Sequence, residues 1–228
     1  MFNSLLNTRH ISYSGCVAQV FFFIFFITSD FCILTVMAYD RYVAICNPLC
    51  YEMVINQQAC TEMLAGVWMA GFLYSGMHTT GTFATHFCSN IVNQFFCDIP
   101  QLMKLTCSDL NLIEMTTIGI GVVLGLGCFL YILVTYVHIF TTVLRLPSAK
   151  GRQKAFSTCI PHLIVCSTFL FTGCAVYLKP ASNTPLWLES IFTVVYSLVA
   201  PMLNPVIYSI RNKEIKKSMS KVLGCRLS

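Results

Sequence analysis

The stretch "VAQVFFFIFFITSDFCILTVMAYDR", Val17 to Arg41, decides the fold of this chain. From Val17 to Tyr39 nearly every residue is apolar, and Asp40 and Arg41 then place an acid and a base directly after the run. A helix needs roughly 20 apolar residues to cross the hydrocarbon core of a bilayer, and this run is long enough. We therefore predict a membrane-spanning helix with a charged pair at its end.

The composition of the whole chain agrees with this interpretation. Hydrophobic residues make up 56% of the 228 residues, charged residues make up only 10%, and the mean hydropathy is +0.71. A soluble domain of this length needs a larger charged surface. We predict an all-α transmembrane helical bundle that forms a single domain, residues 1–228. Its five spans are expected at about Ser14–Tyr39, Ala59–Thr80, Met115–Leu144, Cys159–Leu178 and Trp187–Ile210.

The basic residues predict how the bundle is oriented. Most of them fall near Arg41, in the connection that begins at Arg145, or in the tail that begins at Arg211. The three on the opposite side are Arg9, Lys104 and Lys179. Because an excess of Lys and Arg marks the cytoplasmic side, we expect the N-terminus outside the plasma membrane and the C-terminus in the cytoplasm. The net charge of +5 then reflects topology and contact with membrane lipid, without a need for nucleic acid.

The tail after Ile210 combines lysines with regularly spaced apolar residues. Ile215, Met219 and Val222 recur at helical spacing, which predicts a short amphipathic helix on the inner leaflet. Cys225 lies at the end of this basic segment and is a candidate for palmitoylation.

The thirteen cysteines divide by their expected side of the membrane. Cys16 lies at the outer end of the first span, and Cys88, Cys97 and Cys107 lie in the long outer loop. That side is oxidising, so these four residues can form two disulfides. Their spacing leaves three pairings open. We expect the remaining cysteines to be free thiols.

Five motifs are spread over nearly the whole chain. They are "MAYDRYVAIC" at Met37–Cys46, "QFFCD" at Gln94–Asp98, "KAFSTCIPHL" at Lys154–Leu163, "YLKP" at Tyr177–Pro180 and "PMLNPVIYSIRNKEIK" at Pro201–Lys216. In this order and approximate spacing they resemble the odorant (olfactory) receptor family of rhodopsin-like G-protein-coupled receptors. The resemblance implies a rhodopsin-like seven-helix fold, of which this chain supplies the last five helices and the amphipathic helix. The first two helices of the family have no counterpart here.

The resemblance also implies a switch that meets a heterotrimeric G protein at the cytoplasmic end. The residues that it assigns to this switch are Asp40, Arg41, Tyr42, Asn204, Pro205 and Tyr208. Charges at membrane depth are costly unless they are paired, and they tend to be functional. By resemblance Asp40 restrains Arg41 in the resting state, whereas the simpler alternative is an ion pair that only anchors the helix end. For the proline-containing segment, the alternative to a rearranging element is a static kink.

A pocket for a small volatile odorant is the third implication of the resemblance. Phe23, Ile24, Ile27 and Thr28 share one face of the first span with Phe31, at helical spacing. Such a stripe more often serves helix packing, and its assignment to a pocket comes from the resemblance. The residues assigned to the pocket are Phe23, Ile24, Ile27, Thr28, Cys174, Tyr177, Val194 and Ser197. We expect a mostly apolar pocket with a few polar groups that orient the ligand.

For the outer cysteines, the resemblance selects one of the three pairings. It implies disulfides between Cys16 and Cys97 and between Cys88 and Cys107. The first would tie the long outer loop to the top of the helix, as a lid over the pocket.

Asp30 is the second charged residue of the first span. It lies about 15 Å above Asp40 along a helix that rises 1.5 Å per residue. A lone carboxylate at this depth is protonated, paired or bound to a cation. The resemblance implies a sodium ion near Asp30, held in similar receptors together with an Asp on the second helix.

The predicted function is an odorant receptor that binds small volatile molecules and activates a stimulatory, olfactory-type G protein. Two alternatives stay open: a truncated receptor product that does not signal, and a transporter or channel whose polar residues line a pathway. An enzyme is not expected, because no Ser–His–Asp or His-rich set of residues converges. His86 precedes Cys88 by two residues, but no second ligand pair completes a zinc site, so we predict no metal and no cofactor besides the sodium ion.

Overall fold

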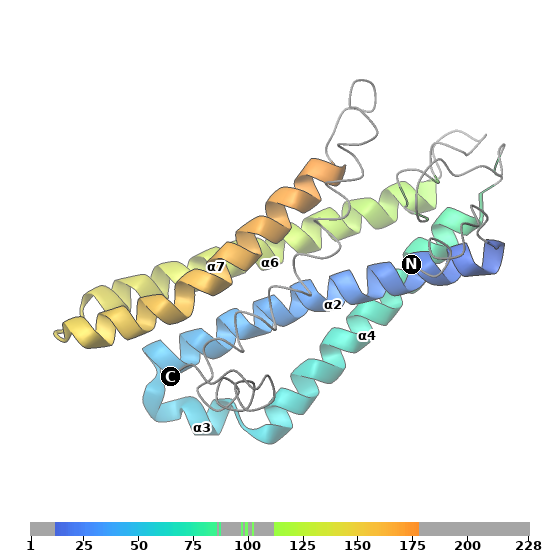
Figure 1. Ribbon diagram of the computed structural model, residues 1–228. Helices are drawn as coiled ribbons and strands as arrows, with labels where there is room; N and C mark the ends of the chain where they lie inside the picture. The colour runs from blue at the N-terminus through green and yellow to red at the C-terminus, as the bar shows by residue number, and fades with distance from the viewer. Residues whose placement is uncertain are drawn as a thin grey trace, which may run out of the picture. The chain divides into compact units, whose positions relative to one another are not determined.

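The computed structural model describes residues 12–85, 87, 97, 99, 102 and 112–177 (Figure 1). Its helices are, in order, α2 (Tyr13–Cys46), η1 (Pro48–Cys50), α3 (Tyr51–Val54), α4 (Gln57–Phe83), α6 (Leu112–Leu144) and α7 (Ala149–Tyr177). They belong to two compact units, Met1–Leu146 and Pro147–Ser228. The fold is helical, as the all-α prediction requires, whereas the single domain stays a prediction.

The first helix of the structure, α2, begins and ends at recognisable capping residues. The Ser12 hydroxyl accepts a hydrogen bond from the Gly15 amide at 3.1 Å and so caps the N-terminus. The helix ends at Cys46, because Pro48 disfavours helical geometry at Asn47. With 34 residues α2 is about 51 Å long. It therefore extends beyond the expected span, and the charged pair lies within its last turns.

The second long helix, α4, packs antiparallel to α2. Its N-terminus is capped by Asn56, whose side-chain oxygen accepts from the Ala59 amide at 2.8 Å. At the opposite end, the rings of Tyr13 and Phe83 meet edge to face with their centroids 5.4 Å apart. The start of α2 therefore lies beside the end of α4, as Figure 1 shows.

A glycine allows α2 and α4 to approach closely. A Cβ atom at Gly71 would lie 2.5 Å from the Ser29 hydroxyl oxygen and 3.2 Å from the Phe25 carbonyl oxygen. Both distances are shorter than ordinary van der Waals contact, so only glycine fits here without a shift of the helices. By contrast, nothing lies within 4 Å of a Cβ at Gly66 or Gly76 on the same helix.

The third helix of the first unit, α6, runs parallel to α2 and antiparallel to α4. Its C-terminal part contacts the end of α2, where the Cys46 thiol lies 3.5 Å from the Thr142 hydroxyl. Its N-terminal part contacts α4, where the Tyr74 hydroxyl donates to the Thr117 carbonyl at 3.3 Å. The unit therefore has two ends, which we name after the predicted orientation: the outer end lies at the start of α2 and the inner end at Cys46.

The second unit contributes one described helix, α7. The Ser148 hydroxyl accepts from the Gly151 amide at 3.3 Å at its start. Pro161 lies inside the helix, which continues through it to Tyr177. The buried residues of α7 recur every three or four positions and so form one face: Cys159, His162, Val165, Cys166, Phe169 and Thr172.

Three described helices are long and apolar enough to cross a membrane. They are Tyr13–Cys46, Met115–Leu144 and Ala149–Gly173, which correspond to the first, third and fourth predicted spans. α4 has the length for the second span, with 27 residues, but its polar side chains, such as Glu62, Ser75 and His78, lower its mean hydropathy. The fifth predicted span and the amphipathic tail helix lie outside the described residues.

The surface of α6 has the character expected for contact with lipid. Val123, Leu124, Leu130 and Val137 are each between 59% and 70% exposed. Apolar exposure over several turns is rare on soluble proteins. It is stable in a bilayer, where the surrounding acyl chains are as apolar as the side chains.

Candidate functional site

The charged residues of the predicted switch lie in the last turns of α2, at the inner end of the first unit. Arg41 is buried, with 8% of its surface exposed, and Asp40 is half-buried. The Tyr51 hydroxyl of α3 donates a hydrogen bond to the Asp40 carboxylate at 2.8 Å. A bond to a charged acceptor is stronger than a neutral one. The structure therefore connects the Asp-Arg-Tyr motif to the loop that follows it.

The hydrogen bond to Asp40 also changes the acidity of Tyr51. The bond stabilises the protonated phenol, and burial and the negative charge of Asp40 act in the same direction, so the pKa of Tyr51 is raised above its ordinary value. A raised pKa in the folded state means that the contact stabilises the fold below pH 10. The stabilisation is lost as the pH rises through the raised pKa.

We expect Tyr51→Phe to lower the free energy of unfolding by about 1 kcal/mol at pH 7, because Asp40 loses a hydrogen bond at a partly solvated site. The difference between the two proteins should shrink as the pH rises above about 10. Thermal unfolding in detergent at a series of pH values measures it. Tyr39→Phe is the matched control, since the described residues include no hydrogen-bond partner of Tyr39. A pH-independent difference between Tyr51→Phe and the parent would contradict the assignment.

The third residue of the motif connects α2 to α6. The ring of Tyr42 meets the ring of His138 edge to face, with the centroids 6.2 Å apart. One turn further, the Cys46 thiol approaches the Thr142 hydroxyl at 3.5 Å and the His138 carbonyl oxygen at 3.9 Å. The inner end of α2 is thus held by α3 through Asp40 and by α6 through Tyr42 and Cys46.

Two apolar side chains beside the switch are unusually exposed. Leu49, in η1, is 98% exposed, and Met53, in α3, is 75% exposed. Both lie in the short loop that also carries Tyr51, after the end of α2. Large apolar side chains at the tip of a loop are costly in water, and they are typical of surfaces that bind another protein.

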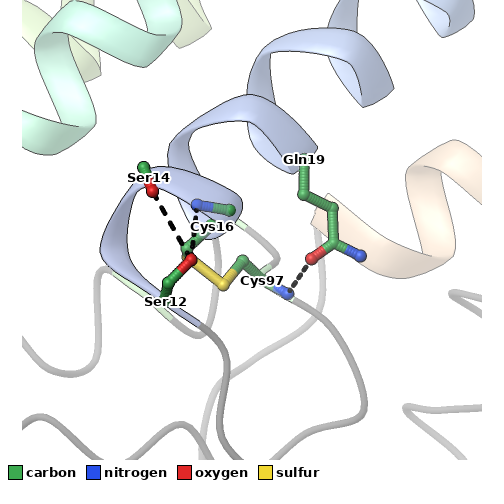
Figure 2. Close-up of a disulfide and its surroundings, with 6 residues drawn as sticks. Ser12, Ser14, Cys16, Gln19 and Cys97 are labelled. Atoms are coloured by element: carbon green, nitrogen blue, oxygen red, sulfur yellow. Dashed lines mark hydrogen bonds between the residues drawn. A yellow bond between two sulfur atoms is a disulfide. The ribbon is translucent and has the colours of Figure 1, made fainter. Parts of the chain in front are cut away.

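At the outer end, a disulfide joins α2 to the long loop between α4 and α6. Figure 2 shows Cys16 bonded to Cys97, with their Cα atoms 5.5 Å apart. The Cys97 amide also donates to the side-chain oxygen of Gln19 at 3.3 Å. This disulfide is the first of the two that the resemblance implies. Cys88 and Cys107, expected to form the second, lie outside the described residues.

The disulfide belongs to a buried apolar cluster. Its buried members are Cys16, Val20, Ile24, Cys97, Ile99 and Leu102, and Phe23, Tyr74, Phe83 and Phe87 pack against it. Two predicted pocket residues, Phe23 and Ile24, therefore lie at this cluster. Ile27 and Thr28 are half-buried one turn further along α2. The described loop residues Cys97, Ile99 and Leu102 belong to the same cluster as Val20 of α2, and the role of the loop as a lid stays a prediction.

The remaining pocket and switch residues are not placed by the described part of the structure. Cys174 and Tyr177 lie in the last turn of α7, and their side chains are not described. The other members lie outside the described residues: Val194, Ser197, Asn204, Pro205 and Tyr208. Their assignments stay predictions.

Asp30 lies in the middle of α2 and is half-buried. It follows Ser29, whose buried hydroxyl faces Gly71 at the crossing of α2 and α4. Across residues 12–85 and 112–177, no three His, Cys, Asp or Glu side chains gather where they could hold a metal ion. The sodium ion at Asp30 stays a prediction.

Sequence reasoning missed three polar contacts that the structure reveals. They are the bonds from Tyr51 to Asp40, from Cys97 to Gln19, and between Tyr74 and His78. The first two join residues of different segments, and no local pattern marks them. The third has a signal, because Tyr74 and His78 are four residues apart on one helix and so lie on one face.

Three apolar helices long enough to span a membrane, a Cys16–Cys97 disulfide and an Asp-Arg-Tyr motif in the last turns of α2 agree with the class of rhodopsin-like G-protein-coupled receptors. A family model described as "Olfactory receptor" matches residues 2–226. Human olfactory receptor 14C36 is 46% identical over 97% of this chain and 71% of its own length. Human olfactory receptor 14A16 is 45% identical over 99% of this chain and 73% of its own length. The chain belongs to the olfactory receptor family.

Family membership determines the class of the protein and its environment. It is a multi-pass membrane receptor with a role in olfaction and sensory transduction, and its class is distinct from enzymes. Members of the family are located in the plasma membrane, and the apolar helices α2, α6 and α7 are long enough to cross its hydrocarbon core.

Proposed function

We propose that this chain binds a small volatile odorant in its outer half and activates a stimulatory, olfactory-type heterotrimeric G protein at its inner end. One observation carries the G-protein assignment. The Asp-Arg-Tyr motif lies in the last turns of α2, shortly before a loop in which Leu49 and Met53 are 98% and 75% exposed. An exposed apolar pair near a buried arginine is suited to a protein partner with an apolar groove into which the loop can insert.

The odorant assignment rests on the outer cluster and on the family. Phe23 and Ile24 lie at a buried apolar cluster that also contains Cys97, Ile99 and Leu102 of the disulfide-tethered loop. Apolar surroundings suit a small volatile ligand, since burial of its apolar surface drives binding. The matching relatives are named olfactory receptors.

The proposed orientation places the disulfide outside the cell and Arg41 in the cytoplasm. A disulfide forms in an oxidising compartment, and Cys16 and Cys97 lie at the outer end of the unit. Arg145 follows the inner end of α6, on the same side as Arg41. Antibody staining of intact cells that carry a tag at either terminus tests this orientation. A C-terminal tag stained without permeabilisation would contradict it.

The coupling surface is tested by substitutions at its most exposed residue. We expect Leu49→Asp to lower the maximal odorant-evoked cyclic AMP response at least about tenfold. A charge in place of an apolar side chain at the centre of the interface lowers the affinity for the G protein. Surface levels should be unchanged, since Leu49 is 98% exposed in the free protein. Leu49→Met, which keeps an apolar side chain of similar volume, is the control. Equal responses from Leu49→Asp and the parent chain would contradict the assignment.

The same assay separates a signalling receptor from a receptor product that does not signal. A parent chain that reaches the cell surface but produces no cyclic AMP with any odorant would support the second alternative. The responses are compared with those of a version that carries the first two helices of olfactory receptor 14C36. Signalling by the extended version alone would show that the present chain needs those helices.

A further inference from the structure

The contact between α4 and α6 is built around the Tyr74 hydroxyl group. This hydroxyl donates to the Thr117 carbonyl oxygen at 3.3 Å and lies 2.9 Å from Nε2 of His78. The rings of Tyr74 and His78 meet edge to face, with their centroids 4.7 Å apart. The tautomer of His78 decides which of the two side chains donates to the other. The contacts to Thr117 and His78 together hold the Tyr74 ring in place.

A glycine of α6 makes room for this hydroxyl. Gly121 follows Thr117 by one helical turn, and a Cβ atom placed on it would collide with the outer atoms of the Tyr74 ring. The neighbouring glycines of α6 behave differently, because nothing lies within 4 Å of a Cβ at Gly119, Gly125 or Gly127. Among these four glycines of α6, Gly121 is therefore the one whose lack of a Cβ atom leaves space for the Tyr74 hydroxyl.

The contact formed by Tyr74, His78, Thr117 and Gly121, which we call the junction, is largely buried. His78 is 5% exposed and Thr117 is 1% exposed. Polar groups at such sites are poorly solvated, so their mutual hydrogen bonds define the helix positions more strictly than apolar contacts do. In a membrane the lipid offers no competing hydrogen bonds.

The Tyr74 side chain also borders the outer cluster. Tyr74 packs against the cluster that contains Val20 and Ile24 of α2 and Cys97 of the loop. This side chain of α4 therefore contacts α6 and borders a cluster built partly from α2. A change in its position would alter the spacing of α4 and α6 beside this cluster, which contains Ile24, a predicted pocket residue.

We propose that Tyr74 and His78 are positioning residues that determine which odorants fit the receptor. They do so by setting the distance between α4 and α6 beside the apolar cluster, and thereby the size of the ligand that the outer half accepts. This role rests on the proposed odorant-binding function. It assigns selectivity to a hydrogen-bonded pair outside the predicted pocket face.

The geometry of the junction is tested first, without any odorant, on the full chain in lipid nanodiscs. We expect Gly121→Ala to unfold at a lower temperature than Gly125→Ala, because only the former meets the tyrosine. Adding Tyr74→Leu to Gly121→Ala should restore part of the loss, since it removes the colliding atoms. Equal unfolding temperatures of the two alanine variants, or no restoration by Tyr74→Leu, would overturn the inference.

Selectivity is tested with cyclic AMP responses to straight-chain alcohols, aldehydes and carboxylic acids of increasing length, at matched surface levels. We expect Tyr74→Phe to change the ratio of the half-maximal concentrations for short and long compounds at least about fivefold. Simple misfolding, by contrast, would lower the responses to all compounds alike. If the parent chain responds and Tyr74→Phe shifts the half-maximal concentrations of all compounds by the same factor, the selectivity role is overturned while the proposed function stands. A parent chain that is silent to the whole series would remove the proposed function, and the selectivity role with it.

Discussion

Replacing Cys97 by serine will lower the free energy of unfolding by about 4 kcal/mol, the largest loss that we expect from one substitution in the described part of the chain. The disulfide closes a segment of 81 residues, and long closed loops restrict the unfolded chain most. The serine hydroxyl would also be buried, since Cys97 is 2% exposed. Thermal unfolding in detergent under non-reducing conditions, together with the fraction of receptor at the cell surface, measures the loss.

The disulfide prediction has a matched control on the same unit. Cys128→Ser changes a free, half-buried thiol of α6, and we expect a loss below about 1 kcal/mol. Cys16→Ser should reproduce the effect of Cys97→Ser, and the double variant should lose little more, because either change removes the same bond. Additive losses from Cys16→Ser and Cys97→Ser would show that the two residues act independently.

The second large effect is expected from Gly71→Ala, at the crossing of α2 and α4. The new methyl group would lie 2.5 Å from the Ser29 hydroxyl oxygen and 3.2 Å from the Phe25 carbonyl oxygen. The hydroxyl can rotate away, but the carbonyl belongs to the backbone of α2, so the helices must separate. Overpacking of this kind costs about 1 to 3 kcal/mol. Thermal unfolding and surface delivery of the variant measure it.

A neighbouring glycine provides the control for this crossing. Gly76→Ala meets nothing within 4 Å, and alanine favours helix over glycine by about 0.5 to 1 kcal/mol. We therefore expect Gly76→Ala to be neutral or stabilising. Adding Ser29→Ala to Gly71→Ala should recover part of the loss, because it removes the nearer of the two colliding oxygens. Equal stabilities of Gly71→Ala and Gly76→Ala would show that the crossing is looser than described.

Much of the local structure could be predicted from short stretches of sequence. The apolar run before Asp40 predicts a spanning helix, and Pro48 predicts its end, which lies at Cys46. The resemblance implied the Cys16–Cys97 disulfide that the structure contains. These features depend on residues close in sequence or on a motif shared with relatives, so they need no knowledge of how the helices pack.

The rotation of each helix about its axis could not be predicted in the same way. In a soluble bundle, a polar face marks the side of a helix that points to water. In a bilayer both the lipid and the protein interior are apolar, so a run such as the one from Phe21 to Phe26 marks no side. Whether Phe22 or Ile24 is buried is settled only by packing, which leaves Phe22 55% exposed and Ile24 4% exposed.

The sequence by itself determined the apolar helices α2, α6 and α7, the end of α2 before Pro48, the charged motif in its last turns and, by resemblance, the receptor family. The tertiary structure decided which polar groups meet: Tyr51 with Asp40, and Tyr74 with Thr117, 43 residues away. It also decided which glycines are needed, since Gly71 and Gly121 lie against a neighbouring helix and Gly76 and Gly125 do not. The physical reason is that helix formation follows from backbone hydrogen bonds within one segment, whereas these contacts depend on the distance and rotation between segments.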